Sequence, residues 1–389
     1  MTATALPPIQ RPVLALALVM TMGVLGYAFG LSVRQAGLLL IGIALGVSLY
    51  HAAFGFTGAY RRVIVHGDMS GVSAQMVMLA AAILLFAPIL AQGDAFGHGV
   101  VGALAPVSIS VALGAFVFGI GMQLGGGCAS GTLFTVGGGN LRMGLVLVFF
   151  CAGAFWGSLD LDWWNRLPGI GNVSLAREFG WEIALPMQLA ALVLIYLGLR
   201  LAGARNKRPI WWGQEFRWMQ ILRGPWPLLL SAGLLALLNW AILLLAGHPW
   251  SINWGFSLWA AKVAVGLGWD PAASSFWNAG YAQVALARPV LADDVSATNI
   301  GILLGALIAA SLAGKVPAKS AASMRSLFAA VVSGLMMGYG ARLAYGCNIG
   351  AFFSGLASAS LHAWLWIACA IPGNVIGVYL RPLFGQRND

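Results

Sequence analysis

The sequence has few charged residues. Of its 389 residues, 8% are charged and 60% are hydrophobic, whereas soluble domains carry about 25% charged residues. This composition excludes an ordinary soluble domain, because too few polar side chains are available to face water. Apolar stretches long enough to cross a bilayer occur roughly ten times. We therefore predict an all-α polytopic membrane protein that forms one integral membrane domain over residues 1–389, with the lipid bilayer as a partner.

Acidic residues are especially scarce, and all of them lie outside the apolar stretches. Buried Asp and Glu chains are the usual sign of a proton relay, so their absence argues against a carboxylate-driven pump and a cation pathway. The formal net charge of +10 does not indicate nucleic-acid binding, because the basic residues are confined to particular loops. The eleven acids are Asp68, Asp94, Asp160, Asp162, Glu178, Glu182, Glu215, Asp270, Asp293, Asp294 and Asp389.

Cysteine is also scarce, and its spacing excludes two common roles. None of the four cysteines lies in a soluble loop, so they do not predict a disulfide framework. They show neither C-x-x-C nor metal-ligand spacing, and we predict no metal and no cofactor. The four are Cys128, Cys151, Cys347 and Cys369.

The apolar stretches divide the chain into two halves, residues 13–202 and 226–381. The stretch 254–268 is aromatic but too short to count as a span. The first apolar run lacks a clear signal-peptide cleavage site, so we expect it to be retained. The predicted spans are 13–31, 36–56, 74–92, 107–124, 142–158, 184–202, 226–247, 298–314, 326–344 and 361–380.

Basic residues predict the orientation. The loop Arg200–Pro225 carries six basic residues against the single acid Glu215, and cytoplasmic loops are enriched in Lys and Arg. We therefore place this loop on the cytoplasmic side of the inner (plasma) membrane. Ten spans then put both termini on that side, and the segment 254–296 enters and leaves on the outer side. Further basic residues predicted on the cytoplasmic side are Arg61, Arg62, Lys315, Lys319 and Arg325.

An internal repeat is the most specific feature of the sequence. Residues 119–139 read GIGMQLGGGCASGTLFTVGGG, and residues 338–350 read GYGARLAYGCNIG. With the predicted orientation the two copies run in opposite directions, so we expect two pseudo-symmetric, inverted repeats with glycine-rich re-entrant loops. The matching positions are Gly119 with Gly338, Gly121 with Gly340, Gly127 with Gly346, Cys128 with Cys347, and Gly131 with Gly350.

Each copy is typical of an interrupted membrane helix. Glycines let the backbone leave the helix, and irregular backbone at membrane depth is stable only when buried in protein or lining a cavity. Residues 130–136 and 348–356 are expected to form short half-helices whose N-termini attract anions. Alternatively, the glycines only permit close helix packing and the cysteines fill space. The residues predicted to line a substrate path are Gly127, Cys128, Ser130, Gly131, Thr132, Gly346, Cys347, Asn348 and Gly350.

Two basic residues accompany the repeats. Arg342 stands five positions before Cys347, where the first copy has Gln123. It would hold or select an anion near the outer mouth; alternatively, it is an interfacial arginine that extends toward the membrane surface. Together with Arg142 and the lack of acids, it favours an anion as the substrate.

Thiols are unusual groups for an anion path, since Arg or Lys would serve an ordinary anion. A thiol is a weak hydrogen-bond donor with a polarisable sulfur, so it suits a sulfur-bearing anion that must be released again. Cys151 and Cys369 lie in apolar runs without glycine loops, and we interpret them as packing residues. We give the same interpretation to His51.

With these motifs, the sequence resembles the YeeE/YedE family of membrane proteins, which is associated with the uptake of thiosulfate and other sulfur compounds. The resemblance covers most of the chain. It rests on GIGMQLGGGCASGT, on GYGARLAYGCNIGAFFSG, on residues 247–271 and on FGFTGAYRR at 54–62. It implies a compact helical bundle in which cysteines pass thiosulfate along a central path, with a TusA-like cytoplasmic sulfur carrier as a partner.

One position departs from the family pattern. Members of the thiosulfate type carry a third cysteine in a stretch resembling R-F-C-F-x-x-A-F-R, and here Gly55 stands in its place. This leaves thiosulfate, sulfite, a selenium compound or another small sulfur species as alternative substrates.

We therefore predict a permease for a small sulfur-containing anion, most specifically thiosulfate, and not an enzyme. One alternative is a membrane sulfurtransferase or redox enzyme that forms a persulfide on Cys128 or Cys347, although no base or redox partner is evident. The other alternative is a structural subunit of a larger complex.

Overall fold

The computed structural model describes residues 7–212, 216–317 and 323–388. Three charged residues that contribute to the predicted charge pattern, Glu215, Lys319 and Asp389, lie outside these ranges. Within them, ten helical segments are long and apolar enough to cross a membrane, which confirms the predicted all-α architecture and number of spans. The aromatic stretch at 254–268 forms α13 (Asn253–Gly266), which is not among the ten.

Seven of the ten spans are built around one long helix each, and three contain a break. The seven are α1 (Arg11–Leu31), α4 (Ser70–Gln92), α7 (Leu141–Leu159), α10 (Trp181–Leu201), α12 (Leu228–Ala246), α15 (Asp294–Ala313) and α18 (Leu361–Leu380). The broken spans are α2 (Val33–Ala52) with α3 (Phe56–His66), α5 (Ile109–Gly125) with α6 (Ala129–Gly137), and α16 (Met324–Leu343) with the π-helix Asn348–Phe353 and α17 (Ser354–Ala357).

The remaining elements are short. They are α8 (Leu161–Trp164), α9 (Leu175–Phe179), α11 (Met219–Arg223), α14 (Gly280–Ala287), and 3-10 turns at Pro271–Ala273, Val290–Ala292 and Arg381–Phe384. In the described ranges, strands form only two antiparallel pairs, β1 (Asp94–Ala95) with β2 (His98–Gly99) and β3 (Pro106–Ser108) with β4 (Gly169–Asn172).

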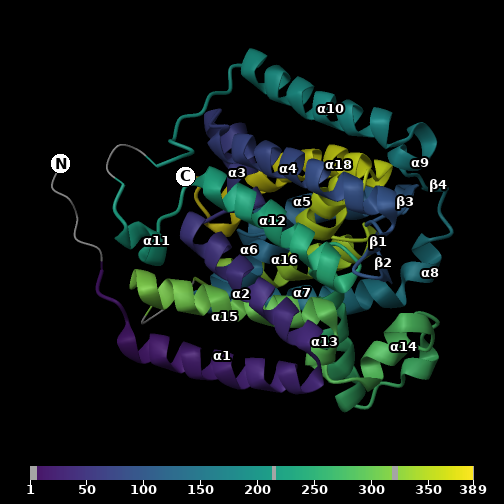
Figure 1. The fold of residues 1–389 in the computed structure, drawn as a ribbon, viewed down its shortest axis with the longest axis horizontal. Coiled ribbons are helices and arrows are strands. Elements are labelled where there is room, and N and C mark those ends of the chain that lie inside the picture. Colours follow the sequence, from purple (N-terminus) through teal and green to yellow (C-terminus); the bar gives the residue numbers. More distant parts are fainter. Residues whose placement is uncertain (1–6, 213–215, 318–322, 389) are drawn as a thin grey trace.

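Glycine allows the central helices to pack backbone against backbone. α2 and α15 pack so closely that only glycine fits at the crossing. A side-chain carbon at Gly46 would lie 2.3 Å from the Ile302 carbonyl oxygen, and one at Gly305 would lie 2.1 Å from the Ile43 carbonyl oxygen. The pairs α7–α16 and α5–α18 pack in the same way. In Figure 1, α1 and α10 flank this core on opposite edges. Small residues are the usual means of close helix approach in membranes.

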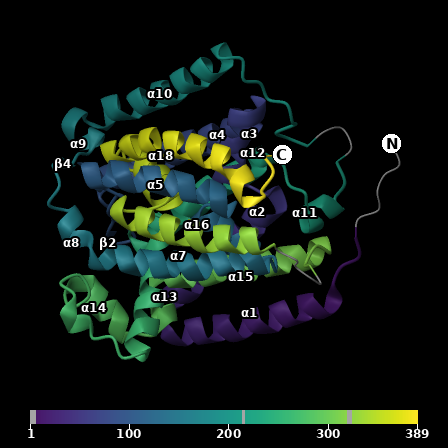
Figure 2. The same cartoon turned by 180° about the vertical axis from the view of Figure 1, so that it is seen from behind.

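The basic segments gather at one end of the bundle. Asp68, between α3 and α4, accepts hydrogen bonds from Arg208 Nε at 2.9 Å and from the backbone of Lys207 at 3.2 Å. Arg223 Nε donates to the carbonyl of Leu312 at 3.1 Å. α11 and the C-terminus lie at this end, whereas α8, α14 and β4 lie at the opposite end, as Figures 1 and 2 show.

Candidate functional site

Cys128 occupies the first of the two breaks carried by the repeat. α5 ends at Gly125, Gly126 takes a left-handed conformation with φ of 86°, and Cys128 becomes the N-cap of α6 in an extended conformation. Its thiol is completely buried and lies 3.3 Å from Ser130 Oγ. Backbone N–H groups of Ser130, Gly131 and Phe56 are directed at the sulfur. The short helix expected after this cysteine is therefore present, with its N-terminus at the thiol.

Cys347 has the same setting in the second copy. It is also completely buried and caps the π-helix Asn348–Phe353 in an extended conformation, with the backbone N–H groups of Ile349 and Gly350 directed at its sulfur. A π-helical turn in place of an α-helical one is rare and is frequent at functional sites. The two thiols are close enough for charge on one to act electrostatically on the other.

The glycine before each cysteine lies close to the backbone of the following turn, most closely at Gly346. A side-chain carbon at Gly127 would lie 3.2 Å from the Gly131 carbonyl carbon, and one at Gly346 would lie 2.7 Å from the Ala351 amide nitrogen. An added carbon at Gly131 would lie 3.7 Å from Cys128 Sγ, an ordinary contact, whereas one at Gly350 would lie 3.3 Å from Ser251 Oγ. The repeat thus preserves one backbone shape around each thiol.

Several buried polar side chains in the cysteine loops and in α3 have no hydrogen-bond partner in the described ranges. Within the described ranges, no acceptor or donor meets Thr132 Oγ1, either amide atom of Asn348, Thr57 Oγ1 or the Tyr60 hydroxyl. All are at most 6% exposed. Tyr60 and Asn348 face each other, and Tyr60 also lies near Cys128, although the hydroxyl and amide do not reach hydrogen-bonding geometry. Buried polar groups are normally hydrogen-bonded. Unpaired groups in this number indicate that a ligand or water supplies the missing partners.

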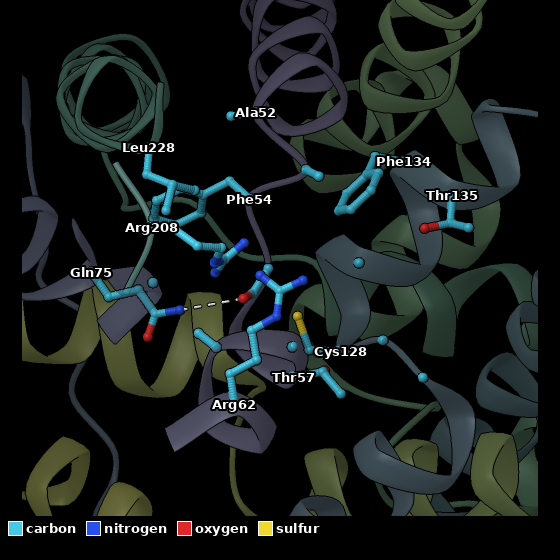
Figure 3. Close-up of a pocket in the computed structure, with 18 residues that line it drawn as sticks. Ala52, Phe54, Thr57, Arg62, Gln75, Cys128, Phe134, Thr135, Arg208 and Leu228 are labelled. Atoms are coloured by element: carbon cyan, nitrogen blue, oxygen red, sulfur yellow. Dashed lines mark hydrogen bonds between the residues drawn. The ribbon is translucent and has the colours of Figure 1, made fainter. Parts of the chain in front are cut away.

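A cavity of about 210 Å³ reaches Cys128 from the basic end of the bundle. Figure 3 shows the thiol pointing into this cavity, toward the guanidinium groups of Arg62 and Arg208. Gly55, the N-cap of α3, also lines it. Arg208 is paired with Asp68, which also lies within electrostatic reach of Arg62. The cavity is therefore lined by two arginines and by the thiol of Cys128.

Arg142 has a structural role that the sequence does not reveal. Its guanidinium donates to the carbonyls of Gly125 at 2.7 Å and Leu124 at 3.1 Å, and to Ser326 Oγ at 2.8 Å. These carbonyls end α5 and have no intrahelical partner. Arg142 thus caps the helix that precedes Cys128.

Arg342 lies against the aromatic segment at the end opposite the basic one. Its guanidinium carbon lies 4.2 Å from the Phe276 ring centre and 6.0 Å from that of Trp254. Its Nε is buried with no hydrogen-bond acceptor among the described residues. The structure therefore places Arg342 in a cation–π contact, whereas the other predicted residues gather around the thiols.

The sequence interpretation missed several site residues. Thr57 and Tyr60 come from α3, Arg62 from the end of α3, and Arg208 from the basic loop. The pairing of Asp68 with the 205–208 segment helps to bring Arg208 to the α3 residues. The adjacency of FGFTGAY to Arg61 and Arg62 was the one available signal for the α3 residues.

In the described ranges, ten apolar helices around two buried thiols and unpaired polar groups define a multi-pass membrane protein with a small polar region in its interior. The chain belongs to the sulphur transport family, whose sequence model matches residues 51–376. This range contains both cysteine loops and α3, and the match confirms the family indicated by the sequence motifs.

The chain is similar to three proteins that are named as transporters. The chain is 27% identical over 350 residues to the thiosulfate transporter TsuA of Spirochaeta thermophila, covering 86% of this chain and 96% of that protein. It is 28% identical over 176 residues to the probable transporter YedE of Escherichia coli, and 29% identical over 175 residues to that of Salmonella typhimurium. Each YedE match covers 44% of this chain and 42% of the relative. All three are named as transporters, which agrees with a non-enzymatic role.

Proposed function

We propose that the protein is an inner-membrane permease for a small sulfur-containing anion, with thiosulfate as the first candidate. The observation that carries this proposal is the pair of buried thiols, each the N-cap of a short helix, with Cys128 at the inner end of an arginine-lined cavity. Backbone N–H groups are directed at each sulfur, and the N-terminus of a helix attracts an anion. The similarity to a protein named as a thiosulfate transporter supports this choice of substrate.

In this proposal the substrate path runs past both copies of the repeat. Its residues are Gly127, Cys128, Ser130, Gly131, Thr132, Gly346, Cys347, Asn348 and Gly350, with Arg342 holding an anion near the outer mouth. The unpaired Nε of Arg342, and the absence of Arg342 from the ion pairs of the described residues, support that last role.

We also propose that the halves 13–202 and 226–381 are inverted repeats with re-entrant segments at the cysteines. Corresponding helices pack in corresponding ways: α5 packs on α18 as α16 packs on α7, and α5 and α16 pack on each other. Inverted repeats commonly place a substrate site at broken helices near the membrane midplane.

The basic end, in the same proposal, faces the cytoplasm and carries both termini. The Cys128 cavity opens there, so a TusA-like sulfur carrier would collect the substrate at this face. Co-purification with such a carrier should depend on Arg62 and Arg208, which line the entrance.

Uptake of labelled thiosulfate into cells lacking their own uptake systems tests the proposal. Wild type, Cys151→Ala and Cys369→Ala should take up the label, whereas Cys128→Ala and Cys347→Ala should lose most of the uptake. The first two variants are matched controls, because they remove a thiol outside the cysteine loops. If both loop variants transported every sulfur anion like wild type, the proposal would be wrong. A stable mass increase on Cys128 during turnover would instead favour a sulfurtransferase.

A further inference from the structure

Four uncharged side chains beside the thiols offer hydrogen-bonding capacity that the protein does not use. Thr57, Tyr60, Thr132 and Asn348 are buried, and their side-chain polar atoms have no partner within the described ranges. Leaving a buried donor unpaired is costly. A cluster of such groups is therefore expected to be satisfied by a ligand.

The four groups come from three places in the fold: the two copies of the repeat and α3. Thr132 lies in the first turn of α6, directly after Cys128. Asn348 is the first residue of the π-helix after Cys347. Tyr60 faces Asn348 and lies near Cys128, and Thr57 lines the cavity beside Cys128.

The position of α3 is fixed by a separate network. Gln123 Nε2, at the end of α5, donates to the Thr57 carbonyl at 3.1 Å and to Asn374 Oδ1 at 2.8 Å. Phe56 packs against Phe352 of the π-helix, with ring centres 6.4 Å apart. Thr57 and Tyr60 are thus held at the thiols by contacts that leave their hydroxyl groups unused.

We propose that Thr57, Tyr60, Thr132 and Asn348 form an oxygen-binding half-site, which receives the oxygen atoms of a small sulfur oxyanion while the thiols of Cys128 and Cys347 contact its sulfur. This rests on the proposed transport of a sulfur-containing anion and defines its class: an anion with both oxygen and sulfur, such as thiosulfate or sulfite, in preference to hydrosulfide.

The chemistry of the four groups carries this preference. Three hydroxyls and a carboxamide donate hydrogen bonds to oxygen, whereas sulfur is a weak acceptor. Hydrogen bonds to a charged partner are stronger than neutral ones, so an oxyanion gains from each donor. Because the four groups carry no charge, they hold an anion without the strong ion pairing that would slow its release.

Ligand binding to the purified full-length protein tests the half-site independently of transport. The probes are thiosulfate, sulfite and hydrosulfide, and the readouts are affinity and the shift in melting temperature. In Tyr60→Phe and Thr132→Val, we expect thiosulfate and sulfite affinity to fall about tenfold or more, with the weak hydrosulfide response unchanged. Tyr379→Phe, at an exposed position, is the matched control and should behave like wild type.

The stability of the ligand-free protein separates a binding role from a structural one. Removing an unpaired buried hydroxyl should leave Tyr60→Phe as stable as wild type or raise its melting temperature by about 2 °C. A lower melting temperature in both variants would indicate a structural role and overturn the proposal. So would unchanged oxyanion affinity, or an equal loss for hydrosulfide. Oxyanion binding that depends on Tyr60 without any uptake would sustain the half-site and contradict the transport function.

Discussion

At the scale of single residues, Gly55 is the most informative position. The sequence resemblance places a cysteine there, and the structure shows why glycine and cysteine are both compatible with the fold. Gly55 has extended backbone angles, φ of −149° and ψ of 142°, and a side-chain carbon would meet nothing within 4 Å. It lines the same cavity as Cys128. A thiol at this position would therefore project into this cavity without displacing a neighbour.

We predict that Gly55→Cys folds with wild-type stability and increases thiosulfate uptake severalfold, because it adds a sulfur contact between the entrance and Cys128. Uptake kinetics and labelling by a small maleimide measure the two effects. Gly58→Cys is the control, since it lines the same cavity and also has free space; it should be labelled without improving uptake. Equal uptake by Gly55→Cys and wild type would show that two thiols suffice.

Also at the residue scale, the sequence predicted the site only in part. The cysteines and their glycines were visible because two copies share one spacing, and the close approaches at Gly127 and Gly346 explain that spacing. Thr57 and Tyr60 were not visible, because an isolated threonine or tyrosine in an apolar run has no periodic partner. Arg142 was included as a polar group near the path, but its hydrogen bonds end α5.

At the scale of elements, hydropathy was sufficient to find the spans but not their breaks. The predicted span 36–56 is in fact α2 followed by α3, and the helix stops where Ala53 adopts a left-handed φ of 45°. An alanine gives no sequence signal for that conformation. The π-helical turn after Cys347 was equally hidden, because its residues are apolar in either helical form.

Close packing of α2 on α15 should be sensitive to a single added carbon. We predict that Gly305→Ala lowers stability by about 1–3 kcal/mol, because the new carbon would lie 2.1 Å from a backbone oxygen of α2. Thermal unfolding in detergent measures this. Gly26→Ala in α1 is the control, since nothing lies within 4 Å of it, and it should be neutral. Similar melting temperatures for the two variants would contradict this account of the core.

A second prediction at this scale concerns pH. The start of α2, the linker after α12 and the start of α15 meet at His248, Asp294 and Arg34. Burial alone would lower the pKa of His248, and Arg34 also lowers it, but the Asp294 carboxylate and the Pro249 carbonyl outweigh them and raise it. A raised pKa means that the protonated form stabilises the fold below about pH 6.5 and that this contribution is lost as pH rises.

We therefore expect the melting temperature of wild type to decrease, by on the order of 1 °C, between pH 6 and pH 8 relative to His248→Gln. The small magnitude reflects a side chain that is 35% exposed. Parallel melting curves at a series of pH values give the comparison. A pH dependence that persists unchanged in His248→Gln would assign it to another group.

At the scale of the whole molecule, charge is separated between the two ends. The basic segments meet around Asp68, whereas Asp160 and Asp162 bond to Tyr339 and Ser275 at the other end. Between them, the four groups of the half-site carry no charge. An inside-negative potential of 100 mV opposes entry by about 2.3 kcal/mol per negative charge, so roughly 4.6 kcal/mol for a dianion. Net uptake then requires consumption of the substrate inside or an accompanying cation.

The proposed orientation makes a direct prediction. In a background where Cys151 and Cys369 are serine, Asp270→Cys should react with a membrane-impermeant maleimide on intact cells. Arg217→Cys should react only after the cells are permeabilised, because it lies in the basic loop. Both positions are exposed, so accessibility does not favour either. The reverse labelling pattern would invert the orientation and place the Cys128 cavity at the outer surface.

The side chains that bind the last carbonyls of α5 are synthesised at very different times. Arg142 is made 17 and 18 residues after the carbonyls that it binds. Arg381 and Gln386, which bind the carbonyls of Gln123 and Leu124, follow 258 and 262 residues later. At about 5–20 residues per second of translation, the loop that bears Cys128 waits roughly 10 to 50 s for its last contacts. During that interval the end of α5 depends on Arg142 for the hydrogen bonds to its last carbonyls.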